Sequence, residues 1–167
     1  SFSDDMRDGL KGSPFDKYST GFISGLTLRE EQVKFSIAGA IDHDQIVNHF
    51  VDTSRLAWAK QPVQCINYIS CHDNYTLFDK LQYSCPESSP ETIERMVRLA
   101  MAILLTSQGV PFLHSGVEIL RTKGGHHDSY RSFDNINQID WNRKITYSGL
   151  FDFTRKCIEL RKLHPAF

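Results

Sequence analysis

Gln64-Cys-Ile-Asn-Tyr-Ile-Ser-Cys-His-Asp-Asn74 is the stretch that decides the fold and carries the strongest candidate for chemistry. Its first part alternates side chains between two faces, which is the pattern of a strand. The strand leads directly into His72, Asp73 and Asn74. Polar side chains at the carboxyl end of a strand are typical of active sites in α/β barrels. The alternative is a simple Asx-type turn, in which Asp73 and Asn74 bond the local backbone.

The composition excludes several classes of function. The chain has 167 residues, of which 40% are hydrophobic, and a formal net charge of -1. These values are those of an ordinary globular domain, and they give no indication of nucleic-acid binding. No apolar run approaches the roughly eighteen residues of a membrane span. The chain begins at Ser1 and not at Met, so we expect a processed chain or a piece of a longer one.

The four cysteines, Cys65, Cys71, Cys85 and Cys157, form no C-x-x-C pair. A domain of this size does not need disulfide bonds for its stability. We therefore expect free thiols, and neither a metal site nor a redox function. The sequence indicates no cofactor, and the cysteines do not identify a cellular compartment.

Signals for helix starts recur along the chain. Thr27–Glu30 has the capping-box pattern, so a helix is expected to begin there. Thr76–Leu81 indicates a short helix. The pair Ser89–Pro90 suits a helix start, and apolar residues then recur at three- and four-residue steps. Ser148 is expected to cap a final helix. Residues 1–25 show little regular pattern, and the glycines and proline between Gly12 and Gly25 indicate a long loop around Phe15 and Phe22.

The order of strands and helices predicts the fold class. After the central strand and its helices, Val110–His114 is a short apolar strand, and the polar loop Arg121–Lys144 follows. Loops this long are usually functional or disordered, and the aromatic residues in this one argue against disorder. Alternating strands and helices predict an α/β fold with parallel strands. Long polar loops on the strand-to-helix side are typical of a TIM (β/α)8 barrel.

The chain is too short for a complete barrel. A whole barrel needs about 250 residues, whereas this chain supplies roughly three βα units. We therefore predict a partial barrel, with residues 1–167 as one domain. An open layer of parallel strands exposes apolar faces. The rest of a barrel is the expected partner for these faces, and dimerisation of the chain is a second way to cover them.

Three motifs occur in an order and spacing that resemble one enzyme family. They are Tyr68–Leu81 with its His-Asp-Asn, Gln108–Glu118 with its Gln-Gly-Val-Pro, and Arg121–Trp141, which holds Arg-Thr-Lys, Ser-Tyr, Asp-x-x-Asn and Asp-Trp. Together they resemble type I pullulanases, which are debranching members of the α-amylase-like glycoside hydrolases. Phe2–Asp8 is similar to the segment around the sixth barrel strand of that family. The resemblance implies the C-terminal portion of a catalytic barrel, roughly the sixth to eighth βα units.

The resemblance also implies a mechanism. The family cleaves α-1,6 branch linkages in α-glucans with retention, using three carboxylates. The nucleophile lies in an Arg-x-Asp setting and the acid/base in a Gly-Glu setting, and neither motif occurs in this chain. Asp73 matches the third carboxylate, which stabilises the oxocarbenium-like transition state. His72 is expected to bond hydroxyls of the same sugar, and Asn74 either to bind substrate or to orient the loop.

Further substrate contacts are expected in the loop after the second strand. Asp134 and Asn137 match family positions that line the substrate subsites, although each could instead cap its own loop. Tyr130 can stack on a sugar face or anchor the loop. The implied ligand is an α-glucan such as pullulan or a branched maltodextrin.

Two other interpretations stay open. His126, His127 and Asp128 suggest a metal site, but adjacent histidines do not converge easily on one ion, and no third ligand has a recognisable spacing. A non-catalytic carbohydrate-binding or structural half-barrel would keep sugar contacts without cleavage. Because two of the three carboxylates are missing, we expect the isolated chain to be inactive.

Overall fold

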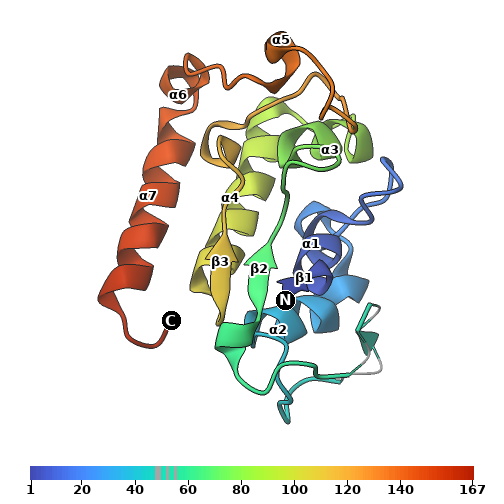
Figure 1. Cartoon of the computed structure of the whole chain (residues 1–167), viewed down its shortest axis with the longest axis vertical. Coiled ribbons are helices and arrows are strands. Elements are labelled where there is room, and N and C mark those ends of the chain that lie inside the picture. Colours follow the sequence, from blue (N-terminus) through green and yellow to red (C-terminus); the bar gives the residue numbers. More distant parts are fainter. Residues whose placement is uncertain (48–49, 52, 55) are drawn as a thin grey trace.

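The computed structural model describes residues 1–167 except 48, 49, 52 and 55. Strands β1 (Phe2–Ser3), β2 (Ile66–Tyr68) and β3 (Val110–Phe112) form a parallel sheet in the order β1-β2-β3 (Figure 1). The α-helices are α1 (Asp4–Lys11), α2 (Glu30–Ile37), α3 (Leu77–Ser84), α4 (Pro90–Thr106), α5 (Asp134–Asn137), α6 (Arg143–Thr146) and α7 (Ser148–Leu163). The 3-10 turns are η1 (Phe22–Ser24), η2 (Thr27–Arg29), η4 (Pro62–Gln64) and η5 (Val117–Ile119). Parallel strands separated by helices confirm the predicted α/β class.

Hydroxyl caps start the two helices that follow β2. The Thr76 hydroxyl accepts a hydrogen bond from the Asp79 amide at 3.1 Å and opens α3. The Ser89 hydroxyl accepts one from the Thr92 amide at 3.2 Å and opens α4. These caps satisfy amides that have no partner inside the helix, so both predicted starts are confirmed. Ser148 is the first residue of α7 and not its cap.

The N-terminal part contains one helix more than the sequence indicated. The expected helix start at Thr27–Glu30 is confirmed, since the 3-10 turn η2 begins at Thr27 and leads directly into α2 at Glu30, although no side-chain cap bond forms at either start. Residues 4–11, for which the sequence indicated no regular pattern, form the helix α1, whose start is fixed by the Ser3 hydroxyl accepting from the Met6 amide at 3.3 Å. A helix of two turns is marginal on its own and depends on tertiary packing. α1 obtains that packing from α2, against which it lies.

The helices form the core on one side of the sheet. Figure 1 shows α4 behind β2 and β3, and α7 beside β3. α4 packs against α7 and α3. Burial of apolar side chains among these elements drives folding. The buried side chains include Met6, Leu10, Ile69, Leu81, Val97, Met101, Leu104 and Leu150. In the part of the chain that the structure describes, no helix has the length and apolar character needed to cross a bilayer.

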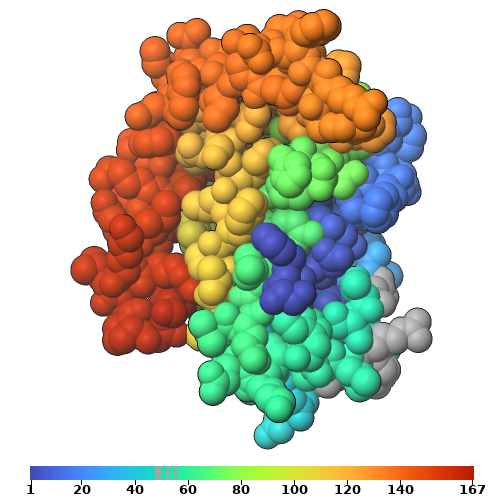
Figure 2. All heavy atoms as spheres, in the orientation of Figure 1, coloured from blue at the N-terminus to red at the C-terminus, as the bar shows by residue number. Residues whose placement is uncertain are grey.

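The opposite side of the sheet exposes large apolar side chains. The Phe2 ring meets the rings of Tyr68 and Phe112 edge-on, with centroids 5.2 and 5.6 Å apart. Half of Phe2 is exposed, and Val110 is also exposed. Figure 2, in the same orientation, shows atoms of the strand segments at the surface between the N-terminus and α7. Because parallel sheets are normally covered on both faces, this surface fits the expected incomplete layer.

Candidate functional site

The predicted site follows β2 at the carboxyl end of the sheet. From Tyr68 the chain passes through buried residues and then bends at His72 to Asn74. The side chains of His72 and Asp73 are 83% and 69% exposed. Asn74 has a φ of 60°, a left-handed conformation that asparagine tolerates better than most residues. Figure 1 shows α5 at this same end of the molecule.

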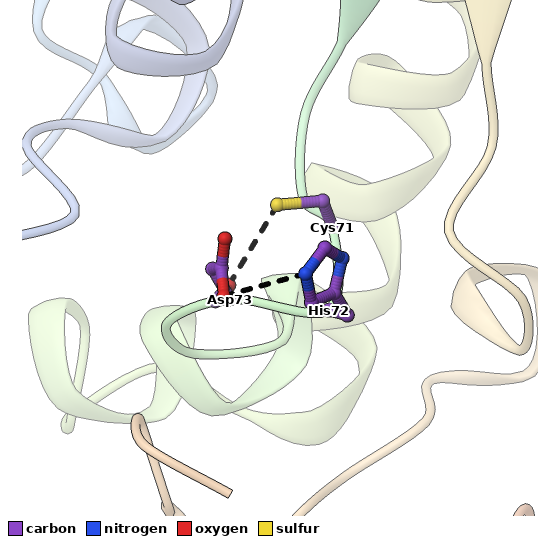
Figure 3. A group of neighbouring side chains, drawn as sticks. All are labelled: Cys71, His72 and Asp73. Carbon is purple, nitrogen blue, oxygen red and sulfur yellow. Dashed lines mark hydrogen bonds and ion pairs between the residues drawn. The ribbon is translucent and has the colours of Figure 1, made fainter. Parts of the chain in front are cut away.

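The carboxylate of Asp73 faces solvent beside an imidazole. The Nε2 atom of His72 lies 3.4 Å from Oδ1 of Asp73 (Figure 3). The Cys71 thiol contacts the main-chain oxygen of Asp73 at 3.9 Å. Within the described residues, neither the Asp73 nor the Asn74 side chain makes the backbone hydrogen bond of an Asx-type turn. The side chains are therefore available for a ligand and are not consumed by the turn.

A buried lysine, Lys123, holds the backbone of the loop that carries His72 and Asp73. Lys123 Nζ donates to the main-chain oxygen of His72 at 2.5 Å. Asp79 Oδ2 in turn accepts from the Lys123 amide at 2.8 Å, and Asp79 Oδ1 accepts from the Thr122 hydroxyl. Lys123 and Asp79 are each only 3% exposed. Burial lowers the pKa of Lys123, and charge-assisted hydrogen bonds are the usual compensation for a buried charge. We name Asp79, Thr122 and Lys123 the buried clamp.

His114, at the end of β3, extends this support. Its Nδ1 lies 3.4 Å from the Ser70 hydroxyl, and its Nε2 lies 3.3 Å from a guanidinium nitrogen of Arg121. Burial, followed by the charges of Arg121 and Lys123, lowers the pKa of His114 to about 4. The neutral ring therefore accepts from Arg121 through Nε2 and donates from Nδ1 to Ser70.

Neither His114 nor the buried clamp was predicted from the sequence. Asp79 and Lys123 lie inside the quoted motifs, and Thr76 three positions before Asp79 marked only a helix start. The one sequence signal for the buried clamp was the presence of two charged residues, Asp79 and Lys123, within otherwise apolar or loop-forming segments. That signal does not separate a buried ion from an exposed one.

The other predicted substrate residues lie in the loop after β3. Asn137 accepts from the Ser129 hydroxyl at 2.9 Å and donates to the main-chain oxygens of Ser129 and Ser132 at 2.8 and 3.1 Å. Of its two predicted roles, the structure shows the loop-capping one. Asp134 is exposed at the start of α5. Tyr130 is also exposed, and the Arg131 guanidinium lies 5.0 Å from its ring centroid.

A cavity lies against the polar loop Arg121–Lys144, and Asp73 does not line it. This cavity has a volume of about 200 Å³. Its walls include Arg121, Lys123 and Asp140, and Asp73 is not among them. The chain therefore presents Asp73, His72, Asp134 and Tyr130 on an open surface.

Potential metal ligands gather at a different place from the one considered in the sequence. Donor atoms of Cys71, His72 and Asp73 all lie within 4.8 Å of one another. Within the described residues, His126, His127 and Asp128 do not form such a group. The His127 ring instead lies 5.5 Å from the ring of Tyr75.

Known proteins share this chain's sequence and fold. No family model matches it. Pullulanase of Bacillus subtilis (strain 168) is 40% identical over 166 residues, which are 99% of this chain and 22% of that protein. Pullulanase 1, chloroplastic, of Arabidopsis thaliana is 35% identical over 175 residues, covering 85% of this chain and 18% of that protein. The chain thus spans about a fifth of the length of these curated relatives.

Solved structures agree with these relatives. The structure of pullulanase type I from Bacillus subtilis str. 168 complexed with maltose superposes with a TM-score of 0.90 at 39% identity, over 98% of this chain and 22% of that one. Pullulanase from Paenibacillus barengoltzii, in complex with maltohexaose and alpha-cyclodextrin, gives 0.88 at 44% identity, over 98% and 24%.

These four relatives and solved structures are glycoside hydrolases, and the two solved structures share this chain's fold. More particularly, they are pullulanases, and this chain corresponds to a portion of one. The family resemblance inferred from the three motifs is therefore confirmed.

Proposed function

We propose that residues 1–167 are the C-terminal portion of the catalytic barrel of a type I pullulanase, roughly its sixth to eighth βα units. The whole protein would cleave α-1,6 linkages in pullulan or branched maltodextrins with retention of configuration. The observation that carries the proposal is the exposed carboxylate of Asp73 at the carboxyl end of a parallel strand. The relatives crystallised with maltose and maltohexaose support an α-glucan ligand.

The proposed role of Asp73 is to stabilise the transition state. Cleavage of a glycosidic bond develops positive charge on the sugar ring. An ionised carboxylate accepts hydrogen bonds from ring hydroxyls and favours that charge, so the contact strengthens as the transition state forms. His72 would bond hydroxyls of the same sugar, with Asn74 shaping the turn. Asp134 and Tyr130 would contact sugars farther along the chain of glucose units.

The proposed nucleophile and acid/base lie outside this chain. Their Arg-x-Asp and Gly-Glu settings do not occur in its sequence. The sheet face on which Phe2 and Val110 are exposed, with the Phe2 ring against Tyr68 and Phe112, is a suitable packing surface for the remaining strands of a barrel. Such strands would also supply the second wall of the site, opposite Asp73.

Substitution of Asp73 in a complete enzyme carrying this chain tests the proposal. We expect Asp73→Asn to lower kcat on pullulan by about 10²-fold or more, because a preorganised transition-state contact is lost. Glu87→Gln, which changes another exposed carboxylate, is the matched control and should keep wild-type kinetics. An Asp73→Asn rate within about threefold of the wild type would contradict the assigned role.

The second candidate function is a carbohydrate-binding or structural half-barrel. It is favoured by the absence of two catalytic motifs from this sequence. We expect the isolated chain to release no reducing sugar from pullulan, and strong release would contradict the proposed division of the site. A calorimetric titration of the isolated chain with maltotetraose then separates a binding module from an enzyme portion that binds only when the barrel is complete.

A further inference from the structure

We propose that Cys71, His72 and Asp73 form a zinc-binding site, with water as the fourth ligand. The three side chains offer a sulfur, a nitrogen and an oxygen donor, all within 4.8 Å of one another. Figure 3 shows the thiol and the imidazole directed toward the Asp73 side of the turn. This site departs from our expectation, based on sequence alone, that the cysteines have no metal-binding role.

The distances are close to those of a tetrahedral zinc complex. Zinc bonds of about 2.0–2.3 Å place neighbouring ligand atoms roughly 3.3–3.6 Å apart. The His72 Nε2 to Asp73 Oδ1 distance is 3.4 Å, so these two atoms already have that spacing. Since no two donor atoms are more than 4.8 Å apart, the largest contraction required is about 1.2–1.5 Å. A rotation of the Cys71 side chain supplies such a movement without unfolding the loop.

The bend of the backbone makes convergence of three consecutive residues possible. In an extended strand, neighbouring side chains point to opposite faces and cannot bind one ion. Here the chain bends at residues 72–74, and Asn74 has a positive φ. The bond from Lys123 to the His72 carbonyl holds this bend from the buried side. The donors are thus presented on a fixed turn.

The chemistry of the donors selects the ion. A thiolate and an imidazole favour zinc over magnesium or calcium, which prefer oxygen ligands. Three protein ligands with one open position are also the arrangement of zinc sites that exchange their fourth ligand. Because His72 and Asp73 are mostly exposed, the ion would bind from solvent with an entry path already open.

Zinc at this site would block the proposed sugar contacts. This consequence rests on the proposed function, because the ion would occupy the Asp73 carboxylate and the His72 imidazole. Zinc would then inhibit glucan cleavage reversibly, and a chelator would restore activity. Binding of the ion itself does not depend on catalysis and is measured separately.

Binding is tested with Zn²⁺ by calorimetry and with Co²⁺ by absorption spectroscopy on the purified chain. We expect one ion per chain and a thiolate-to-cobalt charge-transfer band in the near ultraviolet. Cys71→Ser should abolish the band and weaken Zn²⁺ binding by about tenfold or more, since changes outside the first ligand shell already cost that much. Cys85→Ser, at another partly buried thiol, is the matched control and should keep both signals.

A second variant distinguishes loss of a zinc ligand from misfolding of Cys71→Ser. His72→Gln changes an exposed side chain, and it should also weaken Zn²⁺ binding while circular dichroism stays unchanged. Zinc affinity that is equal in the wild type, Cys71→Ser and His72→Gln would overturn the site. If zinc binds as expected but does not inhibit the complete enzyme, the site stands and the proposed role of Asp73 fails.

Discussion

Two loops at the carboxyl end of the sheet have similar polarity and opposite environments. The loop after β2 exposes His72 and Asp73 to solvent. The polar loop Arg121–Lys144, which follows β3 and the η5 turn, begins with Arg121-Thr-Lys123. Lys123 is buried, and its Nζ atom donates a hydrogen bond to the His72 carbonyl. The first loop presents chemical groups, and the second fixes the backbone that presents them. Polar residues at strand ends therefore include both candidate ligands and their internal supports.

The two loops differ in exposure because the loop after β3 is hydrogen-bonded to a side chain in the helix α3. Asp79, in the first turn of α3, bonds both the Thr122 hydroxyl and the Lys123 amide. These bonds hold the loop after β3 against the start of α3, where Lys123 is buried. A buried charge costs free energy unless it is paired or hydrogen-bonded. The buried ammonium group of Lys123 is hydrogen-bonded to the carbonyl of His72. The loop that carries Asp73 is therefore part of the same hydrogen-bond network as the buried clamp.

The largest expected effect that distinguishes the two loops is that of Lys123→Met in a complete enzyme. Loss of the bond to His72 frees the loop that positions Asp73. A displacement of about 1 Å near a reacting group can cost up to 10²-fold in rate. We expect kcat on pullulan to fall by about tenfold or more, with a smaller change in KM, because transition-state contacts depend most on position. Steady-state kinetics on pullulan measure both constants.

Lys80→Met is the matched control for this experiment. Lys80 is also fully buried, and its Nζ atom donates to the Asp16 carbonyl and, at 3.1 Å, to the Ser19 hydroxyl. It anchors a different loop, so its loss should lower stability and leave kcat near the wild-type value. Equal losses of kcat in the two variants would show a general effect of buried lysines, and the clamp would lose its assigned function.

A second prediction concerns the pH dependence of stability through His114. In the folded protein its pKa is lowered to about 4, whereas the unfolded chain titrates near the ordinary value of about 6.5. Between these values the unfolded chain binds more protons, so stability is highest above pH about 6.5 and decreases as the pH falls toward 4. The loss amounts to roughly 3 kcal/mol at most, which is the full shift expressed as free energy.

Urea unfolding at several pH values between 4 and 7 measures this dependence. His114→Gln cannot titrate there, so its stability should change less over that range. His164→Gln, at an exposed histidine near the C-terminus, should retain the wild-type slope. A slope that is unchanged in His114→Gln would assign the acid sensitivity to other groups.

The contrast between the loops also shows how far sequence reasoning extends. The alternating pattern and the helix caps are local signals, and they located β2, β3, α3 and α4. The polar run His72 to Asn74 was expected at a strand end, and the structure places it there. The clamp joins Asp79 to Lys123, which are 44 positions apart, and no local pattern encodes that contact. Helix α1 was missed although its Ser3 cap is a local signal, because so short a helix has a weak pattern and depends on packing against α2.

The smallest expected effect concerns Asp134 and Asn137 in the loop after β3. It tests whether each of these residues contacts substrate or caps its own loop. Asn137 makes three side-chain hydrogen bonds to Ser129 and Ser132, whereas Asp134 is exposed. We expect Asn137→Ala to lower the free energy of unfolding by about 1–3 kcal/mol, because its loss leaves polar groups of the loop without partners. Asp134→Ala should change stability by no more than about 0.5 kcal/mol, as for other exposed positions.

The KM for pullulan of a complete enzyme that carries each of the two variants completes the test. Urea unfolding measures their stability. If Asp134 contacts sugar, its variant should raise KM for pullulan while stability stays constant. For Asn137, KM should change only together with stability. The reverse result, a stable Asn137→Ala with a raised KM, would mean that the amide leaves its loop partners to bind the glucan. The boundary between presenting and supporting residues would then lie within the loop after β3 and not between the two loops.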